Sequence, residues 1–422
     1  MSSAGPQGVL GWRCAGCGTN VDVATPHPFR CPLATPRDRA HVLHPLLASA
    51  QPAPLDDANP FVAYGPRQAW WAFATANGMT EAACTALAAE VAAGFAVTPL
   101  HAHPFALADD GAPATTVWVK DETGNVARSH KARHLMGILL HLRAAERLGV
   151  VPDGGQRAPL AIASCGNAAI AAATLAERAE WPLQVYVPDW ASPAVLDRLE
   201  ALGAAITACP RDPDGPPGDP AMARFRQAVD AGAIPFSVQG PENALCLDGG
   251  RTLGWELADA VGAPDGPDRL DRVLVQVGGG ALAACVGWGL GASVQLDTVQ
   301  AGGCAPLARA WWRAKDAALT PEQIPGRWNE LMTAWEQPSS RADGIIDDET
   351  YDWLADFAMM RRSNGRPLVV PEEAIVRAHE LALTTGVPVS PTGSAGLAGL
   401  LVRDGRPAAD ERIAVIFTGV ER

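Results

Sequence analysis

Four short motifs carry residues whose types could do chemistry together. The first is a lysine, Lys131, that stands near a hydroxyl residue and an arginine at the start of a helical run. A serine, cysteine, glycine and asparagine follow at 164–167, three glycines at 278–280, and a threonine–glycine pair at 418–419. Each motif alone is common at helix ends and turns. Their order along one chain makes them a candidate site.

The residue types indicate a covalent reaction near a bound anion. An uncharged lysine amine is a nucleophile and can later move a proton. The glycine turn before Asn167 feeds a helix, so its backbone N–H groups can point at an anion such as a carboxylate. The glycines at 278–280 let N–H groups converge on a phosphate without Cβ clashes. Their spacing fits neither a dinucleotide fingerprint nor a P-loop, which disfavours nucleotides as the ligand.

Over residues 117–420 these motifs resemble the pyridoxal-phosphate enzymes of the tryptophan synthase β superfamily, also called fold type II. Within that family the chain is most similar to threonine synthases and to serine and threonine dehydratases. The resemblance implies two α/β domains built on parallel sheets, with pyridoxal 5'-phosphate in the cleft between them. It also implies a lyase that eliminates or replaces a group at the β or γ carbon of a small amino acid.

The resemblance also implies a role for each motif. Lys131 would bond covalently to the cofactor and carry out catalysis. Asn167 would donate to the phenolic oxygen of the cofactor, and Thr418 would hydrogen-bond its pyridine nitrogen. The loop implied to hold the cofactor phosphate consists of Gly278, Gly279, Gly280, Ala281 and Leu282. The loop implied to grip the substrate carboxylate consists of Ser164, Cys165, Gly166, Asn167 and Ala168.

We expect the pKa of Lys131 to be lowered. The lysine opens a helix, lies near the cationic Arg133 and would be partly desolvated, which together disfavour its charged form. Family members commonly have Phe directly before this lysine, whereas this chain has His130. His130 either adds a titrating group beside the lysine or simply packs.

Two activities stay open within the family. The N-terminal cysteines and Thr418 favour threonine synthase-like chemistry on a phosphorylated homoserine, whereas the Lys-Ala-Arg sequence at Lys131 favours serine or threonine dehydration. Ser390 stands where relatives often have Glu before a proline, which leaves the identity of the substrate open. A third alternative is a non-catalytic descendant that only binds the cofactor or a ligand. The presence of all four motifs disfavours that alternative.

Alternation of apolar strands with helices predicts an α/β fold with parallel sheets. The pattern indicates strands at 115–120, 160–163, 183–187, 273–277 and 413–417, and helices at 80–93, 131–148, 168–179 and 192–202. Loops rich in proline and glycine, at 151–159 and 210–220, flank the strands and helices that we expect to form a small mobile domain. The domains predicted are an N-terminal segment (1–60), a large domain (61–149 with 236–422) and a small domain (150–235).

The composition argues against several kinds of partner. The 422 residues include 33 basic and 46 acidic side chains, and the net charge of −13 would repel nucleic acid and anionic lipid. Residues 273–296 are uncharged and long enough to span a bilayer, but their glycines predict a strand, a loop and a buried helix instead. Residues 1–9 do not have the pattern of a signal peptide. We expect a cytoplasmic enzyme that acts on a small amino acid; a homodimer is compatible with this interpretation.

The nine cysteines indicate free thiols, because their number is odd and they are scattered along the chain. Cys14 and Cys17 form a C-x-x-C knuckle, and with Cys31 they resemble the cysteine-bearing N-terminal segment of several threonine synthases. A zinc ribbon needs four ligands. The expected fourth position holds Ala34, and nothing fixes His27 as a substitute. We therefore expect a degenerate knuckle without metal.

Overall fold

A computed structural model describes residues 7–35, 40–107, 113–150, 157–211 and 219–421. Its largest sheet has six strands in the order β12-β11-β10-β13-β5-β4, and only the edge strand β4 is antiparallel to its neighbour. The strands are β4 (Leu100–Phe105), β5 (Thr115–Asp121), β10 (Arg272–Gln276), β11 (Gln295–Ala301), β12 (Pro367–Val370) and β13 (Ile413–Phe417). Both β10 and β13 are buried at every position, as expected for strands of a parallel sheet that is covered on both faces.

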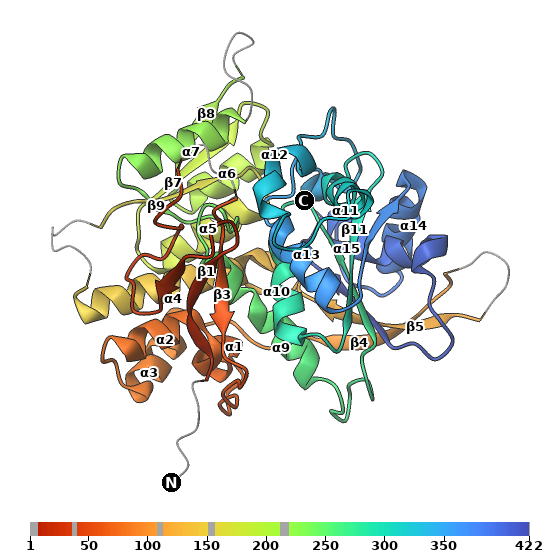
Figure 1. Ribbon diagram of the computed structural model, residues 1–422, viewed down its shortest axis with the longest axis horizontal. Coiled ribbons are helices and arrows are strands. Elements are labelled where there is room, and N and C mark those ends of the chain that lie inside the picture. The colour runs from red at the N-terminus through yellow and green to blue at the C-terminus, as the bar shows by residue number, and fades with distance from the viewer. Residues whose placement is uncertain (1–6, 36–39, 108–112, 151–156, 212–218, 422) are drawn as a thin grey trace.

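Helices cover both faces of this large sheet (Figure 1). Val273 and Val275 of β10 pack in one hydrophobic cluster and Leu274 packs in the other, because alternate residues of a strand point to opposite faces. The first cluster includes residues of α9 (Arg251–Asp259), α10 (Ala281–Leu290), α11 (Pro306–Asp316), α12 (Trp328–Leu331) and α13 (Trp353–Arg362). The second includes residues of α14 (Glu372–Leu383) and α15 (Pro391–Ala398).

A second sheet has four parallel strands in the order β8-β7-β6-β9. Its strands are β6 (Leu160–Ala163), β7 (Leu183–Pro188), β8 (Ala205–Cys209) and β9 (Ile234–Pro235). The helices between them are α5 (Asn167–Arg178), α6 (Pro193–Ala201) and α7 (Pro220–Asp230). Phe225 of α7 packs against Ala161 on one face, whereas Leu175 and Leu199 belong to the cluster on the other. Figure 1 shows this sheet and its helices at the upper left, apart from α11–α15 at the right.

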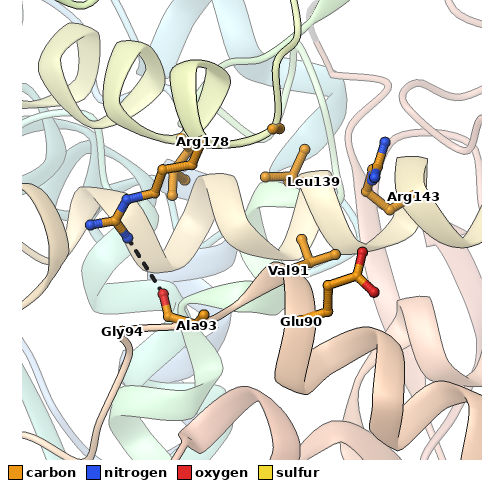
Figure 2. Close-up of a pocket in the computed structure, with 9 residues that line it drawn as sticks. Glu90, Val91, Ala93, Gly94, Leu139, Arg143 and Arg178 are labelled. Carbon is orange, nitrogen blue, oxygen red and sulfur yellow. Dashed lines mark hydrogen bonds between the residues drawn. The ribbon is translucent and has the colours of Figure 1, made fainter.

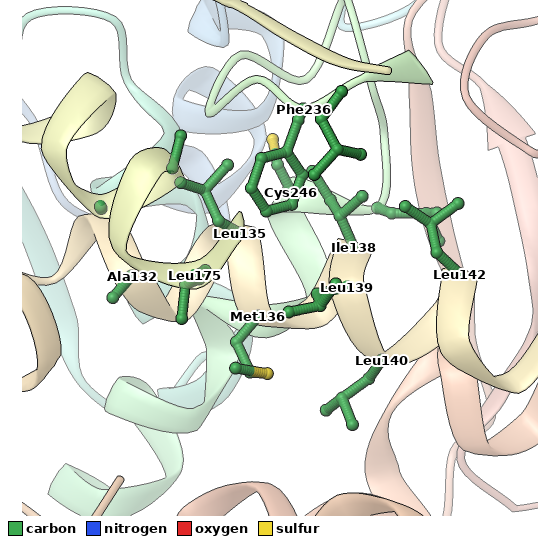
Figure 3. Packing of buried hydrophobic residues seen from close by; sticks show 14 of the residues in the cluster. Ala132, Leu135, Met136, Ile138, Leu139, Leu140, Leu142, Leu175, Phe236 and Cys246 are labelled. Atoms are coloured by element: carbon green, nitrogen blue, oxygen red, sulfur yellow. The ribbon is translucent and has the colours of Figure 1, made fainter. Parts of the chain in front are cut away.

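Helix α4 (Lys131–Leu148) is buried along most of its length and packs against the small sheet. Figure 3 shows its leucines beside Leu175 of α5 and Phe236, which follows β9. The same cluster takes in residues of α1 (Pro60–Ala63), α2 (Ala69–Ala76), α3 (Glu81–Val91) and α8 (Cys246–Gly249). Helix α4 lies in the range 61–149, which was assigned to the large domain, yet it shares its core with the small sheet. The domain boundaries at 149 and 235 therefore stay a prediction.

The N-terminal part forms a three-stranded antiparallel sheet in the order β2-β1-β3. Its strands are β1 (Val9–Cys14), β2 (Asn20–Asp22) and β3 (Leu43–Leu47). Trp12 of β1 and Leu43 of β3 join the hydrophobic cluster that also contains residues of α2 and α4, so the core of this sheet is continuous with the core around those helices.

The sequence pattern predicted most of these elements correctly. The bounds of β6, β13 and α4 agree with the prediction, and residues 273–296 begin with β10, pass through the glycine loop and continue into α10. Within the described ranges, no helix combines the length and the apolar character needed to cross a membrane. Most of the two predicted proline-rich loops, at 151–156 and 212–218, lies outside the described residues.

Candidate active site

Lys131 is the first residue of α4 and follows a strained turn. Ala127 (φ 55°) and Arg128 (φ 59°) both lie in the left-handed region that residues other than glycine rarely adopt. Asn125 supports the turn, because its side chain accepts a hydrogen bond from the Val126 N–H at 2.7 Å. Such strain persists only where surrounding contacts enforce it, and it is concentrated at functional sites.

The contact that enforces this geometry is a buried cluster of charges. The guanidinium of Arg133, two residues after Lys131, donates to Glu122 at 2.8 and 2.9 Å and to Glu256 at 2.5 Å. Lys120 Nζ lies 2.6 Å from the other oxygen of Glu256. Two carboxylates and two cations balance one another, and all four side chains are almost fully buried. The cluster therefore fixes the first turn of α4 to β5 and α9.

Burial is the main cause of the lowered pKa of Lys131. The nearby carboxylates of Asp347 and Asp352 oppose this effect because they favour the charged amine. The guanidinium of Arg133, whose charge was expected to contribute, is paired with Glu122 and Glu256 in the buried cluster. The direction of the expected shift agrees with the structure, and the contribution of Arg133 stays a prediction.

Thr418 lies beside the same turn, directly after β13. The Glu122 N–H donates to the Phe417 carbonyl at 2.8 Å, which brings the end of β13 next to the end of β5. The Thr418 hydroxyl oxygen accepts the His130 N–H at 3.0 Å and lies 2.7 Å from His130 Nδ1. Burial, and then the charge of Lys131, lower the pKa of His130 well below its usual value, so the imidazole is neutral. His130 therefore contacts the residue that the resemblance assigns to the pyridine nitrogen.

Asn167 opens α5 and packs against the turn after Thr418. A Cβ at Gly419, which has φ 81°, would lie 2.8 Å from Asn167 Nδ2, so the close approach needs a glycine. Asn167 Oδ1 is buried and has no hydrogen-bond partner among the residues that the structure describes. Just before it, the Ser164 hydroxyl accepts the Gly166 N–H at 3.3 Å. Ala168 is buried in the next turn, whereas Cys165 is partly exposed.

The three glycines follow β10 and face carboxylates that the sequence analysis did not identify. A Cβ on Gly278 would lie 2.6 Å from an oxygen of Asp347, and one on Gly280 would lie 2.5 Å from an oxygen of Asp356. The Gly279 carbonyl accepts the Asp352 N–H at 2.8 Å. Leu282, in the first turn of α10 after Ala281, is buried. The glycines thus allow the loop backbone to lie directly against carboxylates, without an intervening Cβ.

The four motifs converge because each follows the carboxyl end of a strand. The turn before Lys131 follows β5, the Ser164 loop follows β6, Gly278 lies close behind β10, and Thr418 follows β13. Ligands of open α/β sheets bind at that end of the strands. His130, next to Lys131, contacts Thr418, and the following Gly419 lies against Asn167. The charge of Asp347, which lies against the glycine loop, acts on Lys131.

This donor set fits pyridoxal phosphate. The glycine loop has no Cβ atoms that would block an anion from its backbone, and the Asn167 side-chain amide lies beside Gly419 with its acceptor oxygen Oδ1 lacking a described partner. Lys131 directly follows His130, which contacts Thr418, and the charges of Asp347 and Asp352 act on the Lys131 amine. The other lysines are Lys120, which is paired with Glu256, and Lys315, which is exposed on α11. A phosphate held by this loop would lie close to the carboxylate of Asp347.

A surface groove of about 490 Å³ lies elsewhere, between α3, α4 and α5 (Figure 2). Leu139 and Leu175 form its apolar floor, and Arg178 donates across it to the Ala93 carbonyl at 3.4 Å. None of the residues that line it belongs to the predicted site. The groove is therefore separate from the residues expected to bind the cofactor and the substrate.

Comparison with known proteins agrees with this geometry. The sequence model of the family described as pyridoxal-phosphate dependent enzyme matches residues 91–419, which is most of the chain. The chain belongs to this family. The predicted family, the α/β fold with parallel sheets and the cofactor pyridoxal 5'-phosphate are therefore confirmed.

The curated relatives include two threonine synthases. That of Methanosarcina acetivorans is 27% identical over 320 residues, which cover 72% of this chain and 69% of the relative. That of Synechocystis is 26% identical over 260 residues, and the match spans 61% of either protein. Among solved structures, a threonine deaminase of T.th. is 23% identical with a TM-score of 0.60, and the match covers 80% of this chain and 97% of that one. Maize serine racemase has a TM-score of 0.60 at 19% identity, covering 80% and 92%. At these identities the solved structures support the fold alone.

Replacing Lys131 by alanine is expected to abolish covalent cofactor binding and to lower turnover by at least about a thousandfold, because proton transfer would lose its positioned amine. The melting temperature should change little, since the buried cluster around Arg133 is untouched. Activity and the visible absorbance of the lysine-bound cofactor measure this. Lys315→Ala, on the exposed face of α11, is the matched control. Activity like that of the wild type in Lys131→Ala would contradict the assignment.

Asp352→Asn is expected to stabilise the cofactor-free protein, and more so at higher pH. Burial raises the pKa of Asp352 to about 7, so ionising it in the folded state costs stability as the pH rises from about 4 through 7. The difference between the usual pKa of 3.8 and the value of about 7 corresponds to about 4 kcal/mol. The variant should match the wild type near pH 4 and exceed it at pH 8 in urea unfolding. Asp316→Asn, on an exposed side chain, should show no such trend.

Proposed function

We propose that this enzyme is a lyase that eliminates or replaces a group at the β or γ carbon of a small amino acid. The observation that carries this proposal is the contact of the neutral Thr418 hydroxyl with His130, the residue directly before Lys131, together with the effect of Asp347 beside the glycine loop on the Lys131 amine. When bound, pyridoxal phosphate supplies an electron sink for negative charge on the substrate α carbon. The protein then has to hold the substrate and move its proton.

Lys131 is the group that would remove the α-proton. Burial lowers the pKa of its amine, which increases the fraction of the uncharged base near neutral pH. Thr418 supports elimination in a different way. A hydroxyl does not hold a pyridine nitrogen in its protonated form as a carboxylate would. The imidazole of His130 touches that hydroxyl, so it governs where the hydroxyl proton points.

The substrate carboxylate is proposed to lie at the start of α5. The backbone N–H groups after Ser164 and at the first turn of α5 have no helical acceptor of their own and face outward along the axis. The helix dipole adds a partial positive charge at that end. Cys165, Gly166, Asn167 and Ala168 would supply these groups, and Ser164 would contribute its hydroxyl, because its own N–H donates to the Tyr186 carbonyl at 3.1 Å. Carboxylate binding there would place the α carbon near the amine of Lys131.

Threonine synthase-like chemistry is the first candidate reaction, and it is supported by the matches to two threonine synthases. One observation favours the second candidate, dehydration of serine or threonine. The carboxylates of Asp219, Asp343 and Asp347 add to burial in raising the pKa of Cys165, so they lie around the loop that is proposed to bind the substrate. Negative charges at this place would repel the phosphate of a phosphorylated homoserine.

A panel of small amino acids tests both candidates. Serine, threonine and phosphorylated homoserine would be supplied to the holoenzyme, and 2-oxo acid and inorganic phosphate would be measured. The first candidate predicts phosphate release from phosphorylated homoserine, and the second, which the acidic residues near Cys165 favour, predicts 2-oxo acid from serine or threonine. Phosphate release that predominates would support the synthase candidate instead. Lys131→Ala is the background control, and absence of both products above that background would contradict the proposed function.

A further inference from the structure

The N-terminal sheet brings two cysteines together on one turn. β1 ends at Cys14, and the chain turns back into β2 through residues 15–19. The Cys14 N–H donates to the Thr19 carbonyl at 2.8 Å, and the Gly18 N–H donates to the Cys14 carbonyl at 2.9 Å. Gly18 has φ 73°, which a glycine adopts without strain. This turn is a knuckle that presents the thiols of Cys14 and Cys17 on one side.

Two side chains from later in the sequence lie next to the knuckle. Cys31 Sγ lies 3.8 Å from Cys17 Sγ, and His41 Nδ1 lies 3.5 Å from Cys31 Sγ. His41 comes two residues before β3, whose pairing with β1 sets Leu43 opposite Cys14. The Ala15 N–H donates to the Val42 carbonyl at 2.8 Å, which ties the two segments directly. The ligand atoms of the four residues all lie within 4.8 Å of one another.

Close packing at Gly16 keeps His41 in place. A Cβ at Gly16 would lie 2.5 Å from the Ala40 carbonyl oxygen, so the knuckle and the segment before β3 touch through their backbones. Cys14 and Cys31 are buried, Cys17 is exposed and His41 is intermediate. The four groups are therefore preorganised on different backbone segments around one point near the surface.

We propose that Cys14, Cys17, Cys31 and His41 bind one zinc ion. Three thiolates and one imidazole are a common structural zinc set, and two sulfurs bound at about 2.3 Å in a tetrahedron would lie about 3.8 Å apart. The Cys17–Cys31 separation agrees with this value. The cysteines are free thiols, and a disulfide would need sulfurs about 2.05 Å apart. All four positions come from the protein, so the ion is structural and not catalytic.

This proposal replaces the expectation of a knuckle without metal. That expectation depended on Ala34 or His27 as the fourth position. His27 stacks on Phe29, with ring centroids 5.1 Å apart. His41, and not His27, is the fourth residue beside the three cysteines. His41 lies ten residues beyond Cys31, with 36–39 outside the described residues. No fixed spacing pointed to it.

The ion would hold the segment that leads to Cys31 against the helices of the active site. In that segment the Phe29 carbonyl accepts the Ala244 N–H at 2.9 Å, and Arg30 pairs with Glu242. On α4, His141 Nε2 lies 2.7 Å from the Pro26 carbonyl oxygen. Zinc binding would thus stabilise contacts between the N-terminal sheet, the chain before α8 and the helix that starts at Lys131.

Metal analysis of the purified full-length holoenzyme tests this proposal. Protein would be expressed with zinc and purified without chelators, and its metal content measured by plasma mass spectrometry. We expect about one zinc per chain in the wild type and in Cys84→Ser, which alters a buried cysteine of α3 outside the cluster. Cys17→Ser and His41→Ala should bind zinc more than tenfold more weakly in competition with a chelator.

X-ray absorption at the zinc edge of the wild type keeps the test decisive even where a variant fails to fold. We expect three sulfurs at about 2.3 Å and one nitrogen at about 2.0 Å. A wild type without stoichiometric zinc, a different ligand set, or unchanged zinc affinity in both folded variants would overturn the proposal. Lys131→Ala should keep its zinc while it loses the lysine-bound cofactor, so failure of the zinc site and failure of the proposed function are separately visible.

Discussion

The buried ion pairs of Arg133 are the interaction on which the site depends. Burial opposes ionisation of Glu122, but the charge and hydrogen bonds of Arg133 hold the pKa of that carboxyl below its usual value. Removal of one partner would leave a buried charge without compensation, which typically costs about 3–5 kcal/mol. Glu256 extends the cluster to α9 and Lys120 extends it to β5. The strained turn at Ala127 and the position of Lys131 are consequences of this arrangement.

Around Lys131 the protein places N–H donors that suit anions close to acidic side chains. The glycine loop and the start of α5 present N–H groups to anions, while Asp347 and Asp352 supply negative charge close to the amine. Burial raises the pKa of Asp347 to about 6, so this carboxyl can be neutral at mildly acidic pH. Because Asp347 lies against the loop that would hold the cofactor phosphate, we expect cofactor binding and the charge of Asp347 to be coupled.

Local sequence patterns predicted the parts of the fold and site that depend on local chemistry. The apolar run of β13 and the start of α4 at Lys131 follow from residue type and spacing, and so does the glycine loop behind β10. Contacts between distant segments were not predictable in this way. Glu256 lies far along the chain from Arg133, and Asp347 belongs to a segment without a recognisable motif. Their roles exist only once the sheet has placed these residues side by side.

The most direct test of the account is to identify the lysine that carries the cofactor. Borohydride would reduce the bond between pyridoxal phosphate and the protein in the purified holoenzyme, and peptide mass spectrometry would locate the modified residue. The account predicts modification at Lys131, since Lys120 is held by Glu256 and Lys315 is exposed on α11. Modification at Lys120 or Lys315 in place of Lys131 would contradict the account.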